Sequence, residues 1–175
     1  MGFYYPTKTL SDIALEGEGL ISQTAPRAVN MNSFTLVDGT TQFTLLPLRA
    51  NKTITNIIVY ASAAATNPTL VKLGLYSTAG VRLAVTNDVK ASFNAAGAKV
   101  CELTAAYTPS ADGVVYAAIL ATGGTPPGVY RGAGSDAGRA IGSGAAGWAG
   151  EASQTDLDAT ATLAANAVAV WFGVS

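Results

Sequence analysis

The chain has 175 residues, of which 12% are charged, with a net charge of -1 and no histidine. Without histidine there is no Ser-His-Asp or Cys-His catalytic system and no histidine-ligated zinc, so we expect a non-enzymatic protein with no cofactor and no metal. No basic surplus or long apolar run is present, which predicts no nucleic acid partner and no membrane association. So few charges favour a subunit whose surface is partly covered by neighbours.

Residues 1–30 differ from the rest of the chain and are predicted to form an extended N-terminal arm. The arm begins with the aromatic cluster Phe3, Tyr4 and Tyr5, and Ser11 is placed to cap a helix of one or two turns. Fully extended, such an arm spans about 100 Å at most, which is enough to reach a neighbouring subunit. A frayed terminus is the alternative. The start of the chain does not read as a signal peptide, so we expect synthesis in the cytoplasm.

From residue 31 onward the hydrophobic pattern changes to a period of two, which predicts short β-strands. Asp38-Gly39 lies between β-prone residues and predicts a hairpin. The segment 52–62 is predicted to be a strand covered on both faces. One face carries Ile54, Asn56, Ile58 and Tyr60, and the other carries Thr55, Ile57, Val59 and Ala61.

The next strands are predicted at 69–77 and 81–86, joined as a hairpin, and then at 98–104, 114–121 and 161–174. Cys101, the single cysteine, is expected to be a buried, inert thiol. In the last strand Trp171 is predicted to face opposite to Val168, Val170 and Phe172. About seven to nine short strands without a long helix predict an all-β, antiparallel β-sandwich over residues 31–175, jelly-roll-like in preference to immunoglobulin-like.

Residues 123–150 are predicted to be a long Gly-rich loop before the last strand. Its G-x-G-x-x-A pattern, which begins at Gly132, matches a dinucleotide fingerprint. Pro126 and Pro127 separate it from the preceding strand, so the required strand-to-helix turn is missing. Tyr130 and Trp148 are the large aromatic residues of the loop. They either pin it to the sheet or stack on a sugar or a partner.

Three segments of the sandwich carry a resemblance to a known group of proteins. They are KTITNIIVYAS at 52–62, LVKLGLYSTAGVRLAVTND at 70–88, and ADGVVYAAILATGGTPPGVYRG at 111–132. Together they resemble the jelly-roll virion proteins of tailed phages that infect actinobacteria, a group that includes capsid decoration and minor tail proteins. The resemblance covers roughly residues 30–132. It implies a structural subunit, often an oligomer, that is made in the host cytoplasm and mounted on the virion.

The leading hypothesis is therefore a capsid decoration protein whose partners are the major capsid protein and copies of itself, as a homotrimer. Phe3, Tyr4 and Tyr5 would dock the arm on the capsid or on a neighbour. The alternative is a minor tail or tail-fibre component that binds a host cell-surface glycan through Tyr130 and Trp148. A carboxylate-dependent glycan hydrolase is the third hypothesis, although no acid pair is visible.

Overall fold

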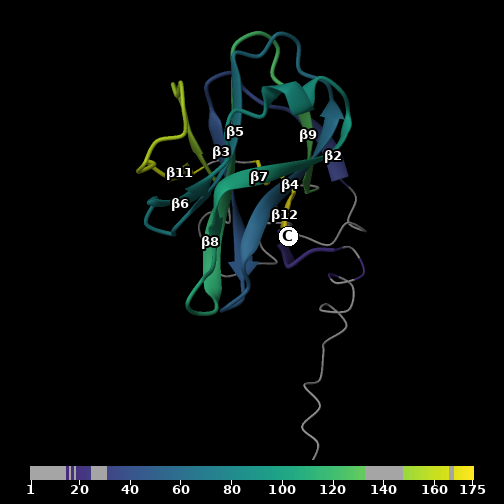
Figure 1. Ribbon diagram of the computed structural model, residues 1–175. Coiled ribbons are helices and arrows are strands. Elements are labelled where there is room, and N and C mark those ends of the chain that lie inside the picture. The colour runs from purple at the N-terminus through teal and green to yellow at the C-terminus, as the bar shows by residue number, and fades with distance from the viewer. Residues whose placement is uncertain (1–14, 16, 18, 25–30, 133–147, 166–167) are drawn as a thin grey trace, which may run out of the picture.

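The computed structural model describes residues 15, 17, 19–24, 31–132, 148–165 and 168–175. In these residues the protein is a β-sandwich of two antiparallel sheets (Figure 1). The predicted all-β sandwich is therefore confirmed, whereas the jelly-roll topology stays a prediction. Twelve strands are present where seven to nine were expected, because several of them have only two to five residues.

The first sheet, here called the β4 sheet, is built around β4 (Ile54–Ala63). On one side β4 pairs with β7 (Gly97–Tyr107), and on the other it pairs with β12 (Phe172–Val174) and β9 (Gly128–Gly132). β12 and β9 pair in turn with the short outer strands β1 (Ser22–Gln23) and β2 (Met31–Thr35).

The second sheet, here called the β8 sheet, is built around β8 (Gly113–Thr122). One side of β8 pairs with β5 (Leu70–Tyr76), which continues to β6 (Arg82–Val85). The other side pairs with β3 (Thr41–Leu48), which continues to β10 (Trp148–Glu151) and β11 (Ala164–Ala165). A 3-10 helix, η1 (Lys90–Phe93), connects β6 to β7 and buries Phe93.

The main core lies between the two sheets and confirms most of the predicted faces. Val71, Leu73 and Leu75 of β5 are fully buried in it, and the predicted hairpin of β5 and β6 is present. Cys101 is buried as expected, and Trp171 faces away from Val170 and Phe172 into a separate cluster. Alternation along a half-buried strand is sufficient to predict this much.

The hairpin predicted at Asp38-Gly39 is wrong, because the two flanking strands belong to different sheets. β2 pairs with β9 and β3 pairs with β8, so the turn carries the chain from one sheet to the other. The Asp38 carboxylate accepts a hydrogen bond from the Gly123 amide at 2.7 Å, and the Gly39 carbonyl accepts one from the Gln154 amide at 2.8 Å. These long-range bonds hold the turn in a bridging position.

The face predicted for Ile54 is also wrong. Ile57, Val59 and Ala61 point into the core as expected, but Ile54 joins them there instead of lying with Ile58. The pairing of β4 with β7 shifts register between Ile54 and Asn56, as a β-bulge does. One extra residue reverses the alternation, so the period of two assigns Ile54 to the opposite side.

Three predicted boundaries need correction. β9 and β10 occupy both ends of the loop predicted at 123–150, and residues 133–147 lie outside the described residues. The predicted last strand at 161–174 is divided into β11 and β12, which belong to different sheets. β1 falls within the predicted arm but pairs with β12, so residues 20–24 belong to the sandwich.

Candidate binding surfaces

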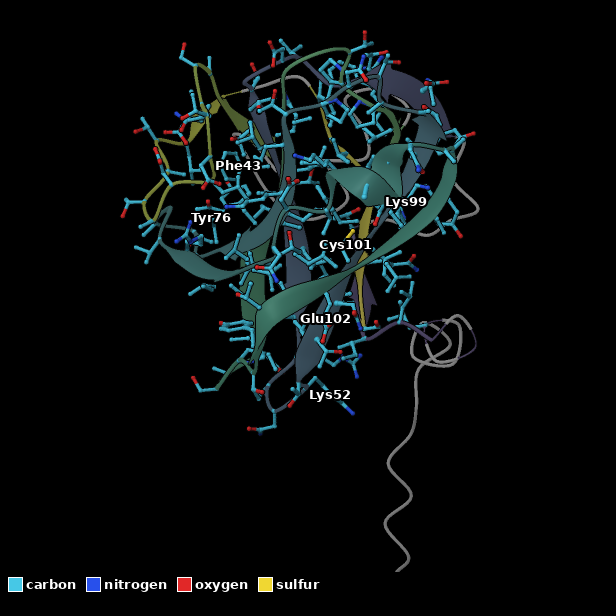
Figure 2. All side chains as sticks on the ribbon, turned by 45° about the horizontal axis from the view of Figure 1, so that its top comes forward. Phe43, Lys52, Tyr76, Lys99, Cys101 and Glu102 are labelled. Carbon is cyan, nitrogen blue, oxygen red and sulfur yellow. The ribbon has the colours of Figure 1, made fainter. Side chains whose placement is uncertain are left out.

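A segment of the same chain, residues 152–163, covers part of the outer face of the β8 sheet. Phe43 and Tyr76 form an edge-to-face pair beneath it, with ring centroids 5.2 Å apart (Figure 2). The Tyr76 hydroxyl donates a hydrogen bond of 2.8 Å to the Asp158 carbonyl, and Leu157 and Ala161 of the segment are buried. Burial raises the pKa of Tyr76 to about 12. The part of this face around Tyr76 is therefore covered by the chain itself, whereas Val114 near the start of β8 stays 41% exposed.

Asp156 and Asp158 of the same segment form an Asp-x-Asp pattern, and each contacts a residue of the β8 sheet. The Lys72 ammonium lies 2.8 Å from the Asp156 carboxylate. Burial opposes ionisation of Asp156, but the hydrogen bonds from Lys72 and from the Leu157 amide outweigh it and lower the pKa. Asp158 contributes its backbone carbonyl to Tyr76. Both residues thus fix the segment on the sheet.

The outer face of the β4 sheet is covered by the same chain over only half of its width. Leu20 packs on Ile58 and Trp171 in a small buried cluster, with Leu15 and Tyr60 at its border. The rings of Tyr60 and Trp171 meet edge to face at 5.5 Å. A Cβ on Gly173 would lie 3.0 Å from the Trp171 ring and 3.1 Å from Leu20, so a larger residue here would have to displace both side chains by a few tenths of an ångström.

The other half of this face, on β7, is open. Ile58, Tyr60 and Asn56 of β4 lie directly opposite Val100, Ala98 and Glu102 of β7, and residues paired in this way share one face of a sheet. Ile58 is 7% exposed, whereas Val100 is 62% exposed. We call the surface formed by Tyr60, Ala98, Val100 and Glu102 the β7 face. Figure 2 shows Glu102 on β7, the strand that carries this surface.

The two aromatic residues predicted to recognise a glycan lie on strands of different sheets. Tyr130 is half-buried on β9 in the β4 sheet, and its carbonyl accepts a hydrogen bond from the Trp171 amide at 3.0 Å. Trp148 begins β10 in the β8 sheet, opposite Thr44, and its side chain lies outside the described residues. Phe3, Tyr4 and Tyr5 also lie outside the described residues.

Arg131 is a residue that the sequence analysis missed. It follows Tyr130 on β9, and its guanidinium carbon lies 5.3 Å from the centre of the Phe34 ring. Its Nε is buried and forms no hydrogen bond with any residue that the structure describes. An arginine in an apolar run near a strand end gives no sequence signal that separates such a position from a solvated one.

The single thiol and the acidic residues of the described ranges can be assessed from their surroundings. Burial raises the pKa of the Cys101 thiol to about 11, so it is protonated at neutral pH and is not a nucleophile there. Within the described ranges, no three of the residues Cys, Asp and Glu lie close enough to hold a metal ion. No helix in the same ranges has the length and apolarity needed to cross a membrane. No protein family, curated protein or solved structure matches the chain.

Proposed function

We propose that this chain is a non-enzymatic structural subunit of a bacteriophage virion, a capsid decoration protein that binds the head as an oligomer. The observation that carries the proposal is the outer face of the β4 sheet, which is apolar, covered over Ile58 and Trp171, and open at Val100. A subunit that assembles with copies of itself or with a capsid works by burying such a surface.

The resemblance to phage virion proteins supports the proposal because its segments are the strands of the sandwich. Residues 52–62 contain most of β4, residues 70–88 contain the hairpin of β5 and β6, and residues 111–132 contain β8 and β9. These residues build and position a framework, and a decoration protein needs a framework with a binding face more than it needs a reactive group.

The N-terminal segment is the part proposed to hold the protein on the capsid or on a neighbouring copy. Because Leu20 and β1 are packed into the sandwich, the segment free for this role ends before Leu15. A deletion that tests it should therefore remove residues 2–14 and leave 15–24 in place, so that the β4 sheet keeps its cover. The shortened protein is expected to stay folded and to lose binding to particles.

Immunogold electron microscopy of purified virions, with antibody against this protein, tests the location. We expect label over the head. Label confined to the tail tip would refute the decoration proposal and favour the minor tail or tail-fibre alternative, in which Tyr130 and Trp148 bind a host glycan. In that case Trp148→Ala should abolish binding to host cells. A virion without label would refute both.

A further inference from the structure

We infer that the β7 face binds the N-terminal segment, residues 1–14, of a second copy of this chain. The inference deepens the proposed function and rests on it in one respect, that the protein works as an assembly of copies. The surface is given by the described residues Tyr60, Ala98, Val100 and Glu102, and the occupant is named by its sequence, MGFYYPTKTLSDIA.

The first argument is the difference between the two outer faces of the sandwich. Residues 152–163 cover the β8 sheet around Tyr76, with Leu157 and Ala161 buried and Tyr76 hydrogen-bonded to Asp158, and Val114 is the exposed apolar residue near the start of β8. On the β4 sheet the cover stops at Ile58, and its cross-strand partner Val100 is 62% exposed. A strand with one face in water normally carries polar residues there. Of Ala98, Val100 and Glu102, only the last is charged.

The second argument is continuity along the chain. Leu15 and Leu20 already cover half of this face, so the segment that precedes them begins at the border of the open half. Fourteen residues reach at most about 50 Å when extended. β7 has 11 residues, or roughly 37 Å of strand. The segment is therefore long enough to pass beyond its own sheet and to cover the same strand of a neighbour.

The third argument is the chemistry of the segment. Phe3, Tyr4 and Tyr5 are large, flat side chains of the kind that packs on a shallow face made of valine, alanine and tyrosine. Lys8 is the only cationic side chain in the segment, and Glu102 is the only charged residue of the β7 face. The two opposite charges give the docked segment a preferred register.

The area required for a stable contact indicates a reciprocal exchange between copies. Three aromatic side chains bury about 450–750 Å² together, at roughly 150–250 Å² each. A stable interface takes about 800 Å² from each partner. If each copy gives one segment and receives one, each copy buries both its segment and its receiving face, so the area buried per copy about doubles and meets that requirement. Docking within one chain would close this face as well, and assembly would lose the surface that the proposed function needs.

Cross-linking between two different single-cysteine variants tests the inference. In a Cys101→Ser background, Thr7→Cys and Val100→Cys are purified separately, mixed, and treated with a short bismaleimide. Thr7 lies next to the aromatic residues and leaves them intact. We expect a cross-linked product of twice the 17.6 kDa chain mass that contains one copy of each variant. The matched control replaces Val100→Cys with Val37→Cys, which is also exposed and should give little product.

Two further measurements complete the test. Light scattering should give the wild type a mass of several chains, and should give Val100→Glu and the 2–14 deletion the mass of one chain. Circular dichroism should show that both variants are folded. Absence of the mixed product would overturn the inference. So would a product that forms only within one chain of the Thr7→Cys, Val100→Cys double variant.

The outcomes of this test can be distinguished from the outcomes of the test of the proposed function. Cross-linking uses the purified protein alone, whereas the capsid location is measured on virions. Exchange between copies without label on the head would leave the inference standing and refute the decoration protein. Label on the head without the mixed product would support the decoration protein and refute the exchange between copies.

Discussion

Leu20→Ala tests whether the segment before β1 is part of the folded sandwich. Leu20 is 4% exposed and packs on Ile58 and Trp171. Truncation of a buried leucine to alanine costs about 2–5 kcal/mol, through lost apolar burial and the cavity left behind. We expect about 3 kcal/mol, in the middle of that range, because the cluster is small and Leu15 borders it. For a domain with about 5–15 kcal/mol of stability this is a large loss.

Urea denaturation is the assay, with the midpoint shifted and the slope unchanged. Hydrogen exchange adds a local measurement, because the amides of Ile21 and Thr24 donate to the carbonyls of Val174 and Phe172. Both amides should exchange faster in Leu20→Ala than in the wild type. Val37→Ala is the control, since Val37 is 52% exposed and its truncation should change the stability by less than about 0.5 kcal/mol. A Leu20→Ala protein within that same margin would refute the reasoning.

Three further predictions concern the interior and the cover of the β8 sheet. Gly80 has φ +82°, and a Cβ there would lie 2.4 Å from the Ala161 carbonyl oxygen, whereas Gly19 has φ +68° and no neighbour within 4 Å. Gly19→Ala should cost about 1–2 kcal/mol of backbone strain and Gly80→Ala clearly more, as measured by urea unfolding; equal losses would contradict the proposed clash. Burial raises the pKa of Tyr76 from 10.0 to about 12, so the folded state holds this proton more tightly, and stability is expected to fall as pH rises from 10 to 12. Tyr76→Phe should weaken that dependence, and an unchanged pH profile of unfolding would count against it. Because Cys101 is buried with a pKa of about 11, alkylation by iodoacetamide at pH 8 should be slow in the folded protein and rapid in urea, and fast labelling without urea would show an exposed thiol.

The sequence predicts the fold class well because the alternation of apolar residues is a local signal. Val71, Leu73 and Leu75 lie on one face in any regular strand, and the structure buries all three. The pairing of strands is a different matter. The turn at Asp38-Gly39 has the composition of a hairpin, but its partners are Gly123 and Gln154, far away in the sequence. Periodicity contains no information about such contacts.

The bulge in β4 shows the same limit at the scale of one residue. Thr55 and Asn56 accommodate the end of the chain, since the amides of both donate to the Ser175 carbonyl at 2.8 and 2.9 Å. The register with β7 shifts between Ile54 and Asn56, and Ile54 turns into the core. The bulge is thus accompanied by a contact with Ser175, 120 residues away from Thr55, which no window around 52–62 contains.

The sequence alone predicts which residues of β7 point away from the core, but not whether they are exposed. Cys101 and Leu103 are two residues apart on a strand, so they share one face, and both are buried. Val100 and Glu102 alternate with them and therefore point outward. What the pattern leaves open is whether a segment of the chain covers them. Residues 152–163 lie between β10 and β11 of the β8 sheet, and the interactions of Tyr76 with Asp158 and of Lys72 with Asp156 fix them on that sheet. Because these residues lie on the β8 sheet, they leave Val100 of β7 exposed, and the proposed exchange of the N-terminal segment between copies would cover it.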